Sequence, residues 1–449
     1  MYQGIIFETS QAFPEISIPF DDVYYDDIIS VCKTVFSGAP PWKKVKRSGL
    51  YGRGERDMAL LNAAKVLCDT MSDLTFGRQA DVIIDDPVKQ QYVRNVLQNN
   101  SFWDKMPNNF SLGYALGGSL VRTFINGGEV KLDYSAADSF VPLERSSRSI
   151  SSGIFRSKFS RDGNFYTLFE IHSHTPDGFT EVSHKLFSSS SPSALGVQIP
   201  LETVFPNMQD TVRYPFSDPM FSYFHPAVSN NILTDGSLGM SVFYNFLDTL
   251  KALDTAFDSL MREFILGRKR IIVPSSCIRT VVDPDTGNVK RYFDADDEVY
   301  QALRCDDDSD LKIIDNTAEL RVDEHITAIN SLLNVLCFQT GLSSSTLSFG
   351  VSSGIRTAAE INSQENRANR TMLSNRNIAA EYLEGIVKSI LAAGAFLGDI
   401  DSAPADVRIT FAKEPDTDID AEIDRNVRLK DLGVISPDEA KDNIRNIFN

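Results

Sequence analysis

The sequence predicts an α+β fold that is mainly α-helical, and three observations lead to this class. Residues 238–266 carry apolar side chains at helical spacing over the whole segment. Residues 352–375 also read as helix, although most of their side chains are polar. Between 118 and 187, in contrast, short β-like runs alternate with turn residues. A chain of 449 residues is long enough for two or three domains or for one elaborate domain.

Residues 1–236 are expected to form one α+β domain. Apolar residues at helical spacing run over 57–75, and a short strand is expected at 81–85. A further helix can begin at Pro87, because proline is favoured in the first turn. The runs LVRTFI and EVKLDY flank an Asn-Gly-Gly sequence at 126–128, which is a strong hairpin signal.

Residues 237–267 form the clearest expected helix. Two series of apolar residues, each spaced by seven, interleave along it and make an a/d seam about 40 Å long. The seam residues expected to be buried include Phe243, Phe246, Leu250, Leu253 and Phe257. Gly267 closes the helix. The same periodicity also fits a long core helix, so it does not by itself establish a coiled coil.

A small module at 268–320 separates this helix from a second one at 321–341. The first residues of the module are basic: Arg268, Lys269 and Arg270. A turn is expected at 283–287 between two strands, because Asp, Pro and Gly gather there. The economical arrangement is an antiparallel helix pair with the module at its far end.

A Ser/Gly-rich loop follows at 342–354, and its two large apolar residues, Leu347 and Phe349, are expected to be exposed. Residues 355–412 then hold a long helix that becomes apolar in its second half. The final segment, 413–449, contains two short helices, the second opened by a Ser-Pro-Asp-Glu capping box.

The long helix after the loop begins with an unusual polar stretch. Between Asn362 and Thr371 it offers one apolar side chain, Ala368. A helix in a globular protein is normally held by burying an apolar stripe. Charged residues of both signs recur at helical spacing instead, namely Arg356, Glu360, Glu365, Arg367 and Arg370.

The composition argues against several classes of protein. A net charge of −17 does not fit a general nucleic-acid-binding protein, which normally carries a basic face. The five cysteines are dispersed, so neither a zinc site nor a disulfide framework is expected. The N-terminus lacks the features of a signal peptide, and no apolar run approaches the roughly 18 residues of a membrane span. We therefore expect no metal, no cofactor and no membrane.

The motifs that resemble catalytic signatures are incomplete. Residues 350–354 match G-x-S-x-G, but a hydrolase of that type needs a histidine after the serine, and the last histidine is His325. No phosphate-binding P-loop occurs. His172 and His174 alternate on an expected strand, yet no third metal ligand stands near them.

One basic patch stands out in the acidic chain. Trp42 is followed by several lysines and arginines up to Arg56. Such a patch can contact phosphate or an acidic partner, but the sequence favours the simpler interpretation, a solvated surface.

The order of these parts resembles one family: the portal proteins of tailed bacteriophages, in the branch from long-tailed phages and prophages of Gram-positive bacteria. The most specific stretch is 221–274, which holds FSYFHPAVSNN and the long helix with its exit LGRKRIIVP. The stretches 60–77, 114–124, 356–375 and 409–440 are similar to other parts of the family. Their order, more than any single motif, carries the resemblance.

The resemblance implies a portal fold with a wing, a long-helix stem, a small α/β clip and a short helical crown. In chain order it implies a wing at 1–236, stem helices at 237–267 and 321–341 around a clip at 268–320, a tunnel loop at 342–354, a long helix with the rest of the wing at 355–412, and a crown at 413–449.

The implied protein is a homo-oligomeric ring of about a dozen subunits at one capsid vertex of the virion, assembled in the host cytoplasm. Its implied partners are the terminase large subunit, the head-tail adaptor, the major capsid and scaffolding proteins, and double-stranded DNA that passes without sequence specificity. In such a ring a polar helix can be held by contacts across subunit boundaries. DNA slides through such a ring only if its phosphates are bound weakly, and the net negative charge of the chain agrees with weak binding.

By the same resemblance the tunnel loop faces DNA with Ser343, Ser344, Ser345, Thr346, Leu347, Ser348 and Phe349. The basic residues 268–270 then lie at the channel mouth of the clip or against a neighbouring clip. The alternative interpretation is an enzyme of phage DNA processing or lysis, which the incomplete motifs oppose.

Overall fold

The structure, a computed structural model, contains both helices and strands, 46% and 24% of residues respectively, so the predicted α+β class is confirmed. It describes residues 4–16, 18, 22–49, 52–77, 80–143, 150–232, 238–267, 271–272, 279–282, 289–292, 314–315, 319–344, 346–349, 358–411, 426–430 and four single positions beyond.

The chain divides into two compact units. The first unit comprises 1–33, 68–242 and 369–449, and the second comprises 34–67 and 243–368. The sequence placed a boundary at 236, six residues before the division at Val242. It did not anticipate that 34–67 belongs with the second unit.

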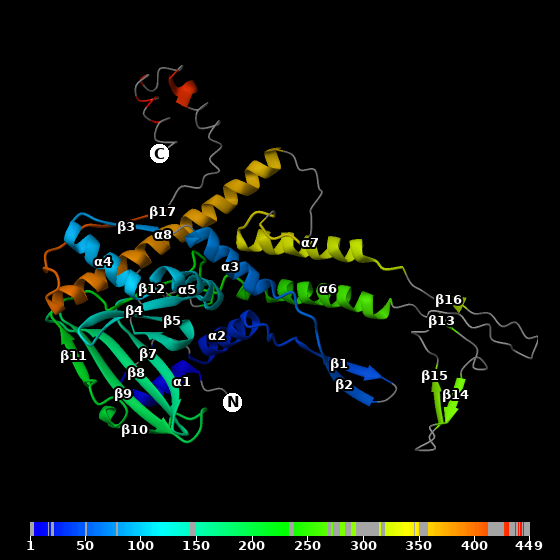
Figure 1. Cartoon of the computed structure of the whole chain (residues 1–449), viewed down its shortest axis with the longest axis horizontal. Coiled ribbons are helices and arrows are strands. Elements are labelled where there is room, and N and C mark those ends of the chain that lie inside the picture. Colours follow the sequence, from blue (N-terminus) through cyan, green and yellow to red (C-terminus); the bar gives the residue numbers. More distant parts are fainter. Residues whose placement is uncertain are drawn as a thin grey trace, which may run out of the picture. The chain divides into compact units, whose positions relative to one another are not determined.

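Antiparallel sheets form much of the first unit (Figure 1). A three-stranded sheet has the order β12-β4-β5, and its strands are β4 (Ser119–Asn126), β5 (Glu129–Ala136) and β12 (Phe221–Phe224). A six-stranded sheet has the order β10-β9-β8-β7-β6 with β11 also on β9. Its strands are β6 (Phe140–Pro142), β7 (Gly153–Arg161), β8 (Asn164–His174), β9 (Thr180–Ser189), β10 (Val197–Ile199) and β11 (Thr211–Tyr214). The hairpin predicted around 126–128 is therefore confirmed as β4–β5, with Asn126 opposite Glu129.

Helices that lie wholly within the first unit include α1 (Ile5–Ala12), α4 (Pro87–Asn99) and α5 (Phe102–Leu116). α4 begins at Pro87 as predicted, because the Asp86 carboxylate accepts from the backbone N–H groups of Val88 and Lys89. Three helices cross the division between the units: α2 (Asp22–Phe36), α3 (Ala63–Phe76) and α8 (Ala358–Leu397). The helix expected over 57–75 is thus shorter at its N-terminal end.

The core of the first unit gathers aromatic rings from α5, β12 and α8. Phe110 contacts Phe224 and Tyr382, with ring centroids 4.8 and 5.8 Å apart. Tyr114 meets Phe224 at 5.4 Å, and the Tyr382 hydroxyl donates to Asn109 Oδ1 at 2.8 Å. All these aromatic rings are nearly inaccessible to solvent. The apolar second half of α8 is therefore a core helix, as its sequence predicted.

Two distant segments complete the first unit with a two-stranded sheet. β3 (Ala80–Ile84) pairs antiparallel with β17 (Val407–Phe411), so that Ile84 lies opposite Val407. Further along, Ser436 and Glu439 exchange the two hydrogen bonds of the predicted capping box, at 2.9 and 3.1 Å.

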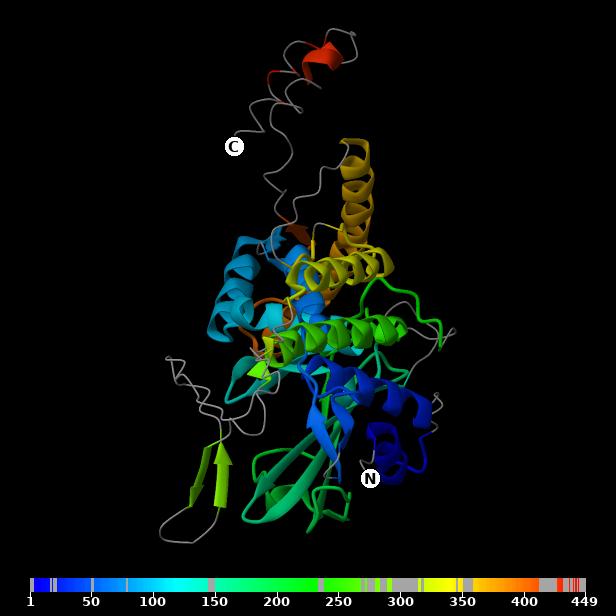
Figure 2. The ribbon, with the colours of Figure 1, turned by 90° about the vertical axis from the view of Figure 1, so that its right-hand side faces the viewer.

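The second unit is built on the helix pair α6 (Leu247–Leu266) and α7 (Val322–Thr340), which pack side by side (Figure 1 and Figure 2). The pair is antiparallel, because Glu263 near the end of α6 accepts from Arg321 just before α7. This arrangement confirms the one expected from the sequence. A hairpin of β1 (Lys44–Gly49) and β2 (Gly52–Asp57) also belongs to this unit.

Short strand pairs lie in the segment between the two helices. β13 (Ile271–Ile272) pairs with β16 (Ile314–Asp315), which ties the two ends of the segment together. β14 (Arg279–Val282) pairs with β15 (Val289–Tyr292), and these are the two strands expected around the turn at 283–287. The turn itself, Arg268, Lys269 and Arg270 lie outside the described residues.

Candidate functional site

The helix pair of the second unit buries two matching apolar stripes. On α6 these are Leu250, Leu253 and Leu260, each at most 4% exposed. On α7 they are Ile329, Leu333, Leu336 and Cys337, which are also buried. The pair is therefore a rigid element with its own small core.

The seam predicted along α6 is only partly buried within the chain. Leu250 and Leu253 are buried, whereas Phe257 is half-buried. Phe243 is buried and Phe246 half-buried, but both precede the helix, which begins at Leu247 and not near 238.

The late start of α6 has a specific cause. The backbone N–H of Val242 donates to the Tyr114 carbonyl at 3.0 Å, so it is not available for a helical bond to residue 238. Gly239 lies so close to the Gly117 carbonyl oxygen that an added Cβ would stand 2.0 Å from it. The segment before α6 is thus held by the end of α5.

The loop after α7 packs against the helix pair over its described residues. Gly341 takes a left-handed conformation, with φ of 77°, and ends α7. Leu342, Ser343 and Leu347 are only 5 to 7% exposed. The prediction that Leu347 is exposed is wrong, because this side chain is buried within the chain.

Phe349 is fixed to both helices. The Asn330 side chain of α7 accepts from the Phe349 N–H at 2.8 Å and donates to its carbonyl at 2.9 Å. The Phe349 ring meets Phe257 of α6 edge to face, with centroids 6.2 Å apart. Ser348 is exposed between these anchors. Ser345 and residues 350–354 lie outside the described residues.

Two carboxylates one turn apart on α6 hold the β1–β2 hairpin at its base. Asp258 forms a bidentate ion pair with Arg56, at 2.7 and 2.6 Å, and also accepts from the Ala59 N–H at 3.0 Å. The Arg56 hydrogen bonds lower the pKa of Asp258 below its usual range. The Asp258 side chain is 9% exposed, so this pair is largely shielded from solvent.

The second carboxylate, Asp254, binds the residues that flank the hairpin, before β1 and after β2. It accepts from the Trp42 indole N–H at 2.9 Å and from the Leu61 N–H at 2.9 Å. Burial raises the pKa of Asp254, although these hydrogen bonds oppose the shift. Sequence reasoning missed both carboxylates. Their signal was two aspartates spaced by four, each directly after a residue of the apolar seam, Leu253 or Phe257.

α8 is one continuous helix of 40 residues, which confirms that the polar stretch is helical. Arg367, within the second unit, donates to the Phe338 carbonyl at 2.8 Å and lies over that ring, 4.7 Å from its centroid. Arg370 is exposed. Arg356 and the side chains of Glu360 and Glu365 lie outside the described part of the chain.

A buried charged cluster joins the two large sheets of the first unit. Glu170 of β8 accepts from His172 at 2.6 Å and from His184 at 3.3 Å, and pairs with Arg122 of β4 at 3.0 Å. Burial alone would raise the pKa of Glu170, but Arg122 and the two histidines lower it well below the usual range. His174 contacts Thr180 instead. The two histidines that alternate on this strand therefore have structural hydrogen-bond partners.

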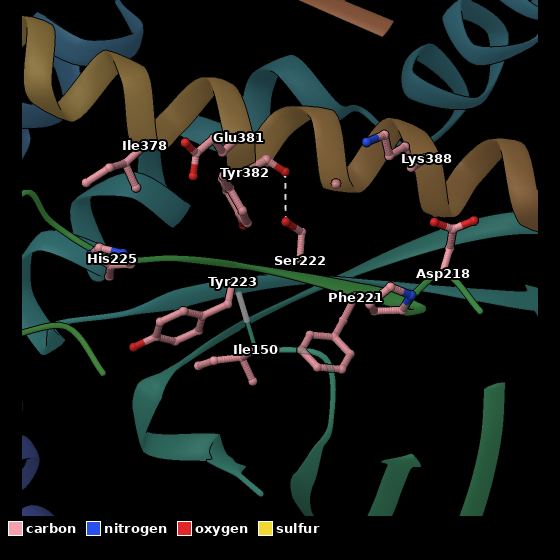
Figure 3. Close-up of a pocket in the computed structure, with 12 residues that line it drawn as sticks. Ile150, Asp218, Phe221, Ser222, Tyr223, His225, Ile378, Glu381, Tyr382 and Lys388 are labelled. Carbon is pink, nitrogen blue, oxygen red and sulfur yellow. Dashed lines mark hydrogen bonds between the residues drawn. The ribbon is translucent and has the colours of Figure 1, made fainter. Parts of the chain in front are cut away.

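A pocket of about 270 Å³ lies between β12 and α8 (Figure 3). Ser222 donates to the Tyr382 carbonyl at 2.9 Å across it. A Cβ on Gly385 would stand 2.5 Å from the Ser222 hydroxyl, so glycine permits this close approach. His225 directs Nδ1 to the Pro226 carbonyl at 3.0 Å. The pocket is thus shaped by the packing of α8 on β12.

Comparison with known families identifies the type of protein. The family described as "Phage portal protein, SPP1 Gp6-like" matches residues 53–449, which is nearly the whole chain. This chain belongs to that family of phage portal proteins. The resemblance inferred from the sequence is therefore confirmed.

The other comparisons are less informative. No curated protein matches the chain. Among solved structures, a chain of "Virion of native gene transfer agent (GTA) particle" is similar over 91% of this chain and 89% of that chain, with 9% identity and a TM-score of 0.43. A likeness at that level carries no argument of its own.

Membership of the portal family supports a place in the phage virion, and the family is a structural one. In the part of the chain that the structure describes, no helix is both long and apolar enough to cross a membrane. The same described residues contain no group of three or more His, Cys, Asp or Glu side chains placed to hold a metal ion.

Proposed function

We propose that this portal protein forms a closed ring of about a dozen copies at one vertex of the capsid. The ring is the conduit through which double-stranded DNA enters during packaging and leaves during ejection. The observation that carries the proposal is the family match over 53–449. The antiparallel pair α6–α7, with β13–β16 beyond one end, supplies the rigid element that such a ring can repeat around its axis.

The charge of the chain supports a conduit without tight DNA contacts. At a net charge of −17, phosphate is repelled on average, so DNA passing the ring meets little resistance. We assign the DNA-facing role within the loop to the exposed Ser348, with Ser344 and Thr346 half-buried beside it. Ser343, Leu347 and Phe349 instead hold the loop on the helix pair.

The segment between α6 and α7 is the proposed docking site for the terminase large subunit and the head-tail adaptor. It follows one stem helix and precedes the other, and β13–β16 ties its ends. Its basic residues 268–270 are proposed to lie at the channel mouth or against a neighbouring copy. Major capsid and scaffolding proteins are the proposed partners of the ring's rim, and assembly takes place in the host cytoplasm.

The proposal is tested by the solution mass of the purified chain together with packaging by the ring. Light scattering on a size-exclusion column should give a species of several hundred kilodaltons. Replacing residues 268–270 by alanine should leave that mass unchanged and reduce virion yield. A monomer at every concentration would contradict the ring. A normal virion yield from the triple variant would contradict the role assigned to residues 268–270.

A further inference from the structure

The β1–β2 hairpin is the basic patch that the proposed function does not use, and the structure fixes its position. Asp254 binds Trp42, which precedes the hairpin, and Asp258 binds Arg56, near the end of β2. Each carboxylate also accepts from a backbone N–H after β2. Withdrawing two carboxylates from water is costly unless they are paired, so this attachment is a built feature of α6.

The hairpin, defined as residues 44–49 and 52–57, has little cover from its own chain at the side chains that the structure describes. It is a two-stranded sheet, and in the described structure no further strand pairs with either edge. Only one of its twelve residues, Val45, is a large apolar residue. Lys46, Gly54 and Glu55 are exposed. A free two-stranded hairpin is marginally stable in water, and packing against another surface stabilises it.

The charge of the hairpin indicates an acidic partner. Its two strands hold five cationic and two acidic residues, in a chain with a net charge of −17. Arg56 is already paired with Asp258, and Lys44 pairs with Asp57 at 2.5 Å. Lys46 is exposed, and the sequence places two more cations, Arg47 and Arg53, on the strands.

The arrangement of charges favours a protein over phosphate as that partner. Lys46 lies opposite Glu55 in the register, two residue pairs along the strands from the Lys44–Asp57 ion pair. A surface built for DNA presents cations without carboxylates directly across the strand pair. Alternating signs are characteristic of protein interfaces, where they set register and reject wrong partners.

We propose that the hairpin docks on a second copy of this chain, at the acidic first turn of α7. That surface carries Glu319, Asp323 and Glu324, all exposed. It lies beside the end of α6, because Arg321 contacts Glu263. The assignment rests on the proposed ring and names the surface that joins neighbours in it.

The lengths permit this contact. A strand of six residues spans about 20 Å, and α6 rises about 13 Å between Asp258 and Gly267. The hairpin is therefore longer than the part of α6 between Asp258 and its end, and the proposed contact requires that it extends toward that end. Cyclic symmetry presents the same turn of a neighbouring copy at that level.

The test is a charge exchange measured by ring assembly. The variant Lys46→Glu with Arg53→Glu should raise the protein concentration needed for half-assembly by about tenfold or more, as expected when interface charges are reversed. The control, Arg161→Glu with Lys131→Glu, changes the net charge by the same amount at positions of the first unit. It should shift the half-assembly concentration by less than about twofold. Circular dichroism and urea unfolding verify that both variants fold.

A second variant decides which surface is involved. Adding Asp323→Lys with Glu324→Lys to the hairpin variant should restore assembly to within about threefold of the parent. Unchanged assembly of the hairpin variant, or a failure of this rescue, overturns the proposal. If the hairpin variant forms normal rings but these rings no longer bind a 30-base-pair DNA duplex, the docking proposal is wrong and the hairpin contacts phosphate. If the parent chain forms no ring at all, the proposed function fails and the hairpin assignment fails with it.

Discussion

Replacing Asp258 by asparagine tests whether the hairpin is held on α6 as the structure indicates. Asparagine keeps the shape and one acceptor oxygen, so it can still accept from the Ala59 N–H. It loses the bidentate ion pair with Arg56, whose two bonds are 2.7 and 2.6 Å long. Hydrogen bonds between charged groups contribute about 1.5–3 kcal/mol each when buried. Because 27% of the Arg56 side chain is exposed, the net loss should fall near 1.5–2 kcal/mol.

The assay uses the small number of tryptophans. The chain has two, Trp42 and Trp103, so a Trp103→Phe background makes fluorescence report on the base of the hairpin. Urea titration of Asp258→Asn in that background should move the Trp42 transition to lower urea. The control is Asp406→Asn, which removes the carboxylate of an exposed pair with Arg408 at 3.6 Å and should change little. An Asp258→Asn loss below about 0.5 kcal/mol would refute the reasoning.

The same pair has a pH signature with a defined sign. Arg56 depresses the pKa of Asp258, so its contribution to stability is fully present above the usual value of 3.8 and is lost as the pH falls through the lowered folded value. The parent chain should therefore lose stability of the hairpin base more steeply below pH 3.8 than Asp258→Asn does. Parallel acid profiles would show that Asp258 does not carry this effect.

Three further predictions concern the core, a buried ion pair and the loop. Leu253→Ala removes a fully buried side chain from α6 and should destabilise the second unit by about 2–4 kcal/mol in urea unfolding; a loss under about 1 kcal/mol would mean that the stripe is not packed. Glu8→Gln leaves Arg156 and Lys158 without their buried carboxylate and should lower the free energy of unfolding by about 3 kcal/mol. Differential scanning calorimetry should show a clear fall in Tm, and an unchanged Tm would contradict this prediction. Ser348→Lys adds a phosphate-binding cation at the exposed position of the loop, and it should slow DNA packaging without changing ring mass; unaltered packaging kinetics would remove the loop from the channel.

Features with a local cause were predictable from the sequence. The Asn-Gly-Gly turn sets the β4–β5 register, and Pro87 with its Asp86 cap starts α4. The capping box at Ser436 and Glu439 closes as its spacing implies. Each of these rests on residues within a few positions of one another.

Features that depend on distant partners were not predictable. α6 begins late because the Val242 N–H is bonded to Tyr114, more than a hundred residues earlier. Leu347 is buried because the loop folds back on α7 through Asn330, which no local pattern reveals. The two aspartates of α6 read as ordinary polar positions, since Trp42 and Arg56 lie about two hundred residues away.

Negative-stain electron microscopy of the purified full-length chain tests the central claim most directly. The account predicts averaged views down one axis that show a closed, cyclically symmetric ring with a central channel open to a DNA duplex. Isolated single particles, or open filaments without rotational closure at any concentration, would contradict it.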